Sequence, residues 1–148
     1  MSAQGPTALD TSVLVAALER SHGHHAVAAR YLQEAHDGTR TLVVAAHALA
    51  ETVSTLTVLP VAPRIPAAMA ERLIRESVLP VVMVVVLDGA DYAAAIARMA
   101  GLGLVNGAVY EALHVQATEK AGAGELVTIN GRDFLRMPPA APCRLVVL

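Results

Sequence analysis

Short apolar segments alternate with amphipathic segments along most of this 148-residue chain, and the alternation constrains the fold more than any other feature. The apolar segments are rich in β-branched residues and end at turn residues, which is typical of strands. We predict strands at residues 7–10, 41–44, 81–87, 125–129 and 145–148, and helices at 13–19, 24–36, 46–56, 67–77, 91–100 and 108–120. This order favours an α/β fold, a three-layer α/β/α sandwich with a mostly parallel central sheet, formed by residues 1–148 as one domain.

Two segments carry more specific expectations. Residues 81–87 are apolar throughout, which indicates a parallel strand that is buried on both faces. Residues 130–134 (NGRDF) have the composition of a turn. Aromatic residues make up only 3% of the chain, so the core must be built mainly from Ala, Val and Leu.

The composition predicts a soluble cytoplasmic protein. Hydrophobic residues make up 55% and charged residues 16% of the chain, which excludes a mainly disordered state. The single cysteine, Cys143, cannot form an internal disulfide, as is usual in a reducing compartment. The first residues do not form a signal peptide, and the most apolar stretch, residues 78–87, is much shorter than the roughly 20 residues of a membrane-spanning helix.

Four acidic residues occupy positions that point to a shared site. Asp10 ends the first predicted strand, Asp133 follows a later strand, and Glu51 and Glu111 lie early on predicted helices. The carboxyl ends of parallel strands meet at one edge of the sheet, where ligands bind. Two carboxylates about 4 Å apart repel by roughly 4 kcal/mol at an effective dielectric of about 20, so the cluster needs a cation. Oxygen ligands favour Mg²⁺ or Mn²⁺ over Zn²⁺.

Each of these acids also has a structural interpretation that the sequence leaves open. Asp10 is suited to cap the helix that follows it, and Asp133 is suited to cap the turn before Phe134. Glu51 fits a solvated helix face, and Glu111 fits the first turn of a helix, where the helix dipole favours an acid.

Four motifs in order resemble the PIN-domain family, and most closely its VapC-type toxin ribonucleases. The motifs are residues 8–14 (ALDTSVL), 47–56 (HALAETVSTL), 103–113 (GLVNGAVYEAL) and 126–134 (LVTINGRDF). Each motif alone is weak, but their order and spacing agree over nearly the whole chain.

The resemblance implies a metal-dependent endoribonuclease that hydrolyses RNA with water activated by Mg²⁺ or Mn²⁺. By the family pattern, Asp10, Glu51, Glu111 and Asp133 are both the catalytic residues and the metal ligands. Thr11, Ser12, Thr128 and Asn130 would support them. The family usually has Asp where this chain has Glu111, whose carboxylate reaches one methylene further.

The resemblance also implies partners. A small antitoxin protein would cover the cleft with its C-terminal segment, and two copies of the chain would form a homodimer. Arg132 and Arg136 flank Asp133 and are candidate RNA contacts, since Arg binds phosphate well. The net charge of −2 agrees with an RNA substrate, because without the four candidate ligands eleven basic residues outnumber nine acids.

Several histidines stand near these motifs without a recognisable pattern. His22, His24 and His25 are expected in a solvated turn rather than in a metal cluster. We expect His47 to be packed or to cap a helix. His114 lies one turn beyond Glu111, which leaves a contact with the cleft open.

Two other functions compete with the nuclease. One is a PIN-like module with a degraded site that binds RNA or a protein without cutting, an alternative that Glu111 keeps open. The other is a receiver-like domain phosphorylated on Asp10, which requires a Lys at a later strand end. The only lysine, Lys120, lies on a predicted helix.

Overall fold

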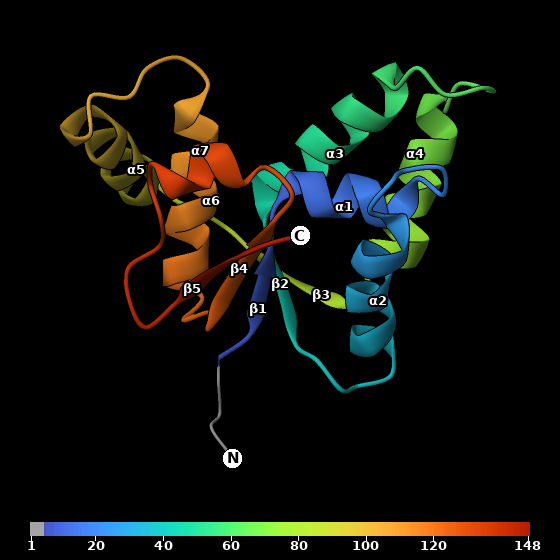
Figure 1. Cartoon of the computed structure of the whole chain (residues 1–148), viewed down its shortest axis with the longest axis horizontal. Coiled ribbons are helices and arrows are strands. Elements are labelled where there is room, and N and C mark those ends of the chain that lie inside the picture. Colours follow the sequence, from blue (N-terminus) through green and yellow to red (C-terminus); the bar gives the residue numbers. More distant parts are fainter. Residues whose placement is uncertain (1–4) are drawn as a thin grey trace.

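A five-stranded sheet in which every neighbouring pair is parallel forms the centre of the computed structural model, which describes residues 5–148 (Figure 1). The strand order is β3-β2-β1-β4-β5, with β1 (Thr7–Leu9) in the middle. Its neighbours are β2 (Leu42–Ala45), β3 (Val82–Val85), β4 (Glu125–Thr128) and β5 (Arg144–Val147). The sheet is therefore parallel throughout the described chain, as the alternation of elements predicts.

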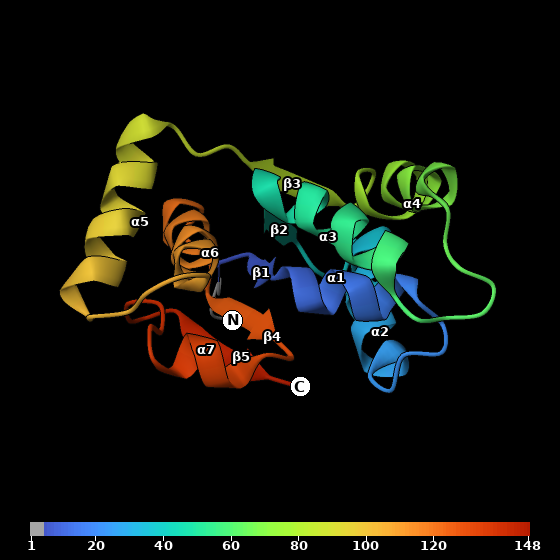
Figure 2. The ribbon, with the colours of Figure 1, turned by 90° about the horizontal axis from the view of Figure 1, so that it is seen from above.

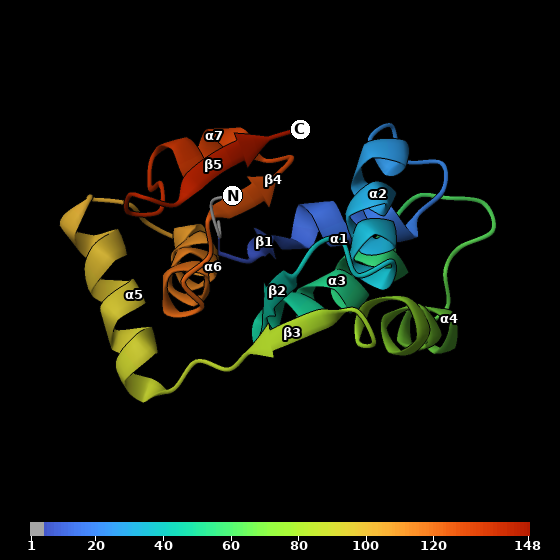
Figure 3. The ribbon, with the colours of Figure 1, turned by 90° about the horizontal axis from the view of Figure 1, so that it is seen from below.

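Helices cover both faces of this sheet and complete the predicted three layers. Figure 1 shows α1 (Thr11–Leu18), α2 (His25–His36) and α4 (Ala67–Leu73) on one side of the strands, and α6 (Ala108–Lys120) and α7 (Gly131–Leu135) on the other. In Figure 3, α5 (Gly89–Gly101) lies outside α6 and away from the sheet. The remaining helices are α3 (Ala46–Val58) and the π-helical turn η1 (Ile74–Val78).

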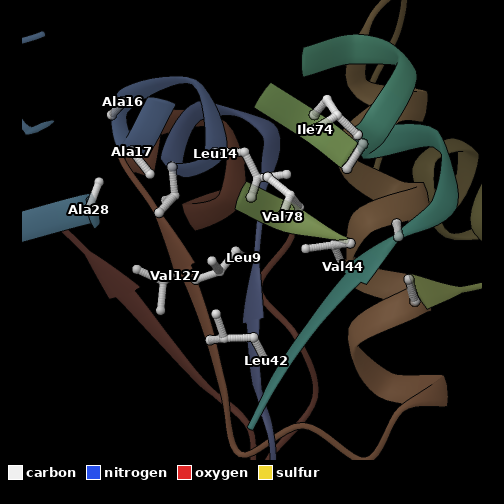
Figure 4. Close-up of a cluster of buried hydrophobic side chains, with 14 residues drawn as sticks. Leu9, Leu14, Ala16, Ala17, Ala28, Leu42, Val44, Ile74, Val78 and Val127 are labelled. Carbon is white, nitrogen blue, oxygen red and sulfur yellow. The ribbon is translucent and has the colours of Figure 1, made fainter. Parts of the chain in front are cut away.

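The core is built from small and branched aliphatic side chains, as the composition predicts. On one face Leu9 and Val127 pack beneath Leu14 of α1, and Figure 4 shows this cluster. Ala16 and Ala28 are fully buried where α1 meets α2, so small side chains let these two helices approach closely. On the other face Ala8, Val43, Val115 and Leu126 surround Phe134, the only phenylalanine of the chain. Burial of each Leu or Phe contributes about 1.5–3 kcal/mol to folding.

The prediction that residues 81–87 form a strand buried on both faces is wrong. The strand β3 is an edge strand that pairs only with β2, and Met83 is 62% exposed. An apolar run has the same pattern in a central and in an edge strand, so only the packing of the neighbouring helices decides its burial. The helix α5 that follows β3 packs against α6 instead of covering the strand (Figure 2).

Two local predictions also need correction. Residues 130–134 are not a plain turn, because Gly131–Leu135 form the helix α7. A Cβ atom on Gly131 would lie 2.8 Å from the side chain of Val147, so the glycine lets α7 sit directly on β5. The helix predicted at 67–77 changes from α to π geometry at Ile74 and ends at Val78.

The carboxyl ends of the central strands carry very short connections to helices. A single residue, Asp10, separates β1 from α1, and α3 begins directly after β2. Two residues separate β4 from α7. The first turns of α1, α3 and α7 therefore lie at one edge of the sheet, where the sequence predicts the acidic site. Within residues 5–148, no helix is long and apolar enough to cross a membrane.

Candidate functional site

Asp10 lies between β1 and α1, and both of its carboxylate oxygens are engaged. Ser12 Oγ donates to Oδ1 at 2.6 Å, and the backbone N–H of Val13 donates to the same oxygen at 3.2 Å, which makes Asp10 the N-cap of α1. Thr128 Oγ1 donates to Oδ2 at 2.7 Å. A carboxylate has about four lone-pair positions, so one remains free on Oδ2. The helix-capping interpretation is confirmed, and it is compatible with a metal ligand.

A pocket of about 330 Å³ opens beside Asp10 at the carboxyl edge of the sheet. Its lining contains three of the four predicted acids, Asp10, Glu51 and Glu111, which come from β1–α1, α3 and α6. Asp10 and Glu111, which are 101 positions apart in the sequence, thus line the same pocket. The convergence follows from the parallel sheet, because α3 begins at the edge to which β1 and β4 also run.

The fourth acid, Asp133, lies on α7 just outside the pocket lining. It accepts hydrogen bonds from Asn130 Nδ2 at 2.6 Å and from Arg136 Nη2 at 2.9 Å. It is close enough to Glu111 for its charge to act on that residue. Of the two arginines predicted to bind RNA, Arg136 is therefore paired with Asp133 and half exposed, while Arg132 is exposed on α7.

The predicted supporting residues contact the carboxylates directly. Ser12 and Thr128 bind Asp10, and Ser12 Oγ also accepts the backbone N–H of Ile129 at 3.0 Å, which ties β1–α1 to β4. Thr11 Oγ1 donates to Glu51 Oε1 at 3.1 Å. Asn130 contacts Asp133 and donates its backbone N–H to Thr128 Oγ1 at 2.8 Å.

The environment of Glu111 disfavours the charged form of its carboxyl group. Burial raises the pKa of this carboxyl, and the charges of Asp133 and Glu51 raise it further, against its own backbone N–H and His114. Burial also favours the neutral form of Glu51. There the hydrogen bond and charge of His114, with His47 and Thr11, outweigh burial and lower the pKa. Glu111 therefore differs from Glu51, because its pKa is raised whereas that of Glu51 is lowered.

Two histidines that sequence reasoning did not assign to the site lie against Glu51. The Nε2 atoms of His47 and His114 are 3.2 Å and 3.1 Å from Glu51 Oε1. His47 and Glu51 are four residues apart on α3, a spacing that is visible in the sequence, whereas His114 comes from α6. The predicted packing of His47 is confirmed, but no side chain caps α3.

The histidine turn after α1 contributes one residue to the pocket wall. His22 lines the pocket opposite Glu111, while the ring of His25 lies 2.9 Å from the backbone oxygen of Ala16. His22 Nδ1 accepts the backbone N–H of His24 at 3.1 Å. His22 and His24 therefore contact each other, whereas His25 is the first residue of α2 and contacts α1.

A larger hollow of about 550 Å³ lies at the opposite edge of the sheet, lined by residues that include Thr7, Arg40 and Glu125. Its charged groups already pair with one another, since Arg40 lies 3.9 Å from Glu125 and 2.6 Å from Glu34. The acidic pocket is smaller, but it is the one whose lining contains three of the predicted acids.

Comparison of the sequence with known protein families gives a match. The profile of the PIN domain matches residues 7–138. The chain belongs to the PIN-domain family. A sequence comparison with curated proteins gives no significant match.

Solved structures of low sequence identity share the PIN fold of this chain. VapC20 of Mycobacterium tuberculosis, described as a sarcin-ricin loop cleaving toxin, is 20% identical, with 81% of this chain and 86% of that chain covered and a TM-score of 0.62. VapBC2 of Rickettsia felis, bound to a promoter DNA fragment, is 17% identical with 96% of each chain covered and a TM-score of 0.63. FitAcB of Neisseria gonorrhoeae is 16% identical, with 95% and 96% covered and a TM-score of 0.62.

The residues present fit the divalent ion that a PIN nuclease requires. The pocket offers carboxylate oxygens from Asp10, Glu51 and Glu111, with Asp133 beside them. Burial is the main cause of the raised pKa of Glu111, and the nearby charges of Asp133 and Glu51 add to it, so a cation in the pocket would favour the charged form of this carboxyl. Oxygen ligands of this kind suit Mg²⁺ or Mn²⁺.

Proposed function

We propose that this PIN domain is a metal-dependent endoribonuclease and the toxin of a VapBC-type toxin–antitoxin pair, acting on RNA in the cytoplasm. The observation that carries the proposal is the pocket of about 330 Å³ that three carboxylates from separate elements line. The PIN family match over residues 7–138 supports it. So does the shared fold of VapC20, although at 20% identity that likeness concerns the fold alone.

The four acids would hold Mg²⁺ or Mn²⁺. When bound, the ion supplies Lewis-acid chemistry for phosphodiester hydrolysis, namely activation of water and neutralisation of charge on the phosphate. Ser12 and Thr128 orient Asp10, and Thr11 and His114 orient Glu51. Burial raises the pKa of Glu111, and a bound cation would oppose this shift by favouring the charged form that a metal ligand needs.

Two exposed arginines at α7 are the proposed contacts to the RNA backbone. Arg132 lies on α7, and Arg136 directly follows the last residue of this helix and pairs with Asp133. Guanidinium groups bind phosphate through paired N–H donors. Because both arginines flank Asp133 in the sequence, an RNA strand held by them would pass close to this acid.

We also propose two protein partners. The likeness to VapBC2 and to FitAcB supports a small antitoxin that covers the pocket. A second copy of the chain is the proposed partner of the apolar surface on α5, where Tyr92 is 41% and Ile96 is 49% exposed. These two side chains are one helical turn apart, and large apolar groups at such positions are usual in interfaces.

The direct test is cleavage of RNA by the purified chain, with Mn²⁺ or Mg²⁺ and with EDTA. We expect cleavage that depends on the ion and falls at least 100-fold in Asp10→Asn, since this change removes a ligand charge. Asn also caps helices, so the variant should fold, and circular dichroism verifies this. Asp37→Asn is the control, because Asp37 is an exposed acid at the end of α2. Equal cleavage by Asp10→Asn and the unmodified chain would overturn the assignment.

The alternative of a binding module gives a different result in the same experiment. The feature that favours this alternative is Glu111, which stands where the family usually has Asp and reaches one methylene further. A non-catalytic module would bind labelled RNA without cleaving it, and calorimetry would detect no Mn²⁺ binding. Metal binding that disappears in Asp10→Asn supports the nuclease.

A further inference from the structure

A compact group of nitrogen and oxygen ligands lies at the wall of the acidic pocket. Nε2 of His47 and Nε2 of His114 are 3.2 Å and 3.1 Å from the same atom, Oε1 of Glu51. The two imidazole rings are 4.4 Å apart between centroids. One ligand atom from each residue lies within 4.8 Å of the other two. Two imidazole nitrogens and one carboxylate oxygen thus face a common point.

Hydrogen bonding alone does not satisfy these groups. Thr11 Oγ1 donates to Glu51 Oε1 at 3.1 Å, so this oxygen has three polar neighbours but only two lone pairs. Nε2 of His47 is a buried atom without a hydrogen-bond partner in the described chain, despite its short distance to Glu51. Such an atom is rare in native proteins. A cation shared by the three ligands would satisfy all of them.

The geometry and the donor atoms favour Zn²⁺. Bonds of about 2.0–2.1 Å in tetrahedral coordination place ligand atoms about 3.3 Å apart. The distances of 3.2 Å and 3.1 Å from Glu51 Oε1 to Nε2 of His47 and of His114 are close to that separation. Imidazole nitrogen suits Zn²⁺, whereas Mg²⁺ prefers oxygen and water. Glu51 and His114 also line the pocket, so a fourth position would be open to it.

We propose that His47, Glu51 and His114 form a Zn²⁺-binding site in the wall of the pocket. The site shares Glu51 with the carboxylates proposed for Mg²⁺ or Mn²⁺. Zn²⁺ would therefore withdraw Glu51 from that set and inhibit RNA cleavage. The inhibition rests on the proposed nuclease function, whereas the binding of Zn²⁺ does not.

Metal titration of the tag-free chain, without RNA, tests the site. We expect one equivalent of Zn²⁺ to compete with a chromophoric chelator, and Co²⁺ to give the intense visible absorption of tetrahedral coordination. His47→Gln and Glu51→Gln, which keep nearly the same volume, should each lower Zn²⁺ affinity at least 30-fold. Circular dichroism verifies that each variant is folded. The Co²⁺ spectrum of the unmodified chain provides a test that depends on no variant.

Two control variants locate the bound ion. Glu111→Gln should leave Zn²⁺ affinity unchanged and weaken Mn²⁺ binding, because Glu111 belongs only to the carboxylate set. His24→Gln should leave Zn²⁺ affinity unchanged, and a loss there would assign the ion to the histidine turn and overturn the proposal. Absence of stoichiometric Zn²⁺ binding, or unchanged affinity in His47→Gln, would overturn it as well.

Cleavage assays separate this proposal from the nuclease assignment. Zn²⁺ binding without any RNA cleavage would support the histidine site and contradict the nuclease. Mn²⁺-dependent cleavage without Zn²⁺ binding would do the reverse. If both proposals hold, micromolar Zn²⁺ reduces Mn²⁺-dependent cleavage at least tenfold, and His47→Gln restores it.

Discussion

Thr128 Oγ1 donates a 2.7 Å hydrogen bond to Oδ2 of Asp10, and the two residues are 118 positions apart in the sequence. The bond joins the carboxyl ends of β1 and β4, which are neighbours in the sheet. Thr128 is fully buried, and its hydroxyl also accepts the backbone N–H of Asn130. One hydroxyl group thus holds a candidate metal ligand and the loop that leads to α7.

Replacing this hydroxyl should destabilise the chain and weaken metal binding. Thr128→Val keeps the shape but leaves a buried carboxylate without one donor, and hydrogen bonds to charged groups contribute about 1.5–3 kcal/mol. We expect urea denaturation to show a loss of about 2–3 kcal/mol. Calorimetry should show at least tenfold weaker Mn²⁺ binding. Thr118→Val is the matched control, because buried Thr118 donates only to the backbone oxygen of His114. Equal losses in both variants would contradict a special role for Thr128.

Removing the charge of Glu111 should stabilise the metal-free chain at neutral pH. Burial, Asp133 and Glu51 raise its pKa, so the neutral form stabilises the fold below about pH 4.3 and this contribution is lost as the pH rises through the raised pKa. Glu111→Gln stays neutral, so in EDTA at pH 7.5 its Tm should be about 1–3 °C higher, a small gain because the side chain is partly exposed. The gain should vanish near pH 4.

The control for this prediction is Glu76, whose pKa is lowered whereas that of Glu111 is raised. Arg72 lowers the pKa of Glu76 through a hydrogen bond, so its charged form stabilises the fold above the ordinary carboxyl pKa and that contribution is lost on acidification. Glu76→Gln should therefore not raise the Tm at pH 7.5. A higher Tm in both variants would indicate a general effect of net charge instead of local repulsion.

The ion pair between Arg98 and Glu119 should hold α5 against α6. Both guanidinium Nη atoms donate to the carboxylate, and Glu119 Oε1 also accepts the backbone N–H of Ala140 at 2.8 Å. We expect Arg98→Met to lower the free energy of unfolding by about 1 kcal/mol in urea denaturation. Arg75→Met removes exposed pairs with Glu71 and Glu76, and it should cost about 0.3–0.5 kcal/mol because exposed pairs contribute little. A smaller loss for Arg98→Met than for Arg75→Met would argue against this role.

A charge on the apolar surface of α5 should prevent self-association. Ile96 is 49% exposed one turn from Tyr92, whereas buried Ala95 makes the contact with α6. Light scattering coupled to size-exclusion chromatography should show a dimer for the unmodified chain and a monomer for Ile96→Glu. Val58→Glu is the control, because Val58 is 68% exposed at the end of α3 and should leave the dimer intact. A monomeric unmodified chain would contradict the proposed interface.

Much of the candidate site follows from the sequence, because the carboxyl ends of parallel strands lie at one edge of the sheet and the positions of the acids relative to the strands can be read from the sequence. Asp10 is the only residue between a strand and a helix, so its place at the carboxyl edge depends on local pattern alone. Glu51 and Glu111 both line the pocket, which agrees with the prediction that the acids gather at the carboxyl edge of the sheet. The metal ligation of all four acids stays a prediction.

The histidine environment of Glu51 was beyond sequence reasoning. The contact between His47 and Glu51 could be predicted from their spacing of four residues on α3. The contact of His114 could not, because His114 is 63 residues from Glu51 in the sequence. No pattern along the chain indicates that α6 places its ring against α3. The protonation state of these groups depends on burial, which arises only when the helices pack.

The sequence by itself determined the order of strands and helices, the parallel sheet and the edge that carries the acids, because these follow from hydrophobic period and short connections. The tertiary structure alone decided that β3 is an exposed edge strand and that Asp133 lies outside the pocket lining. It also decided that two histidines adjoin Glu51. These features depend on contacts between segments far apart in the chain, and the free energy of such contacts is set by packing and desolvation instead of local pattern.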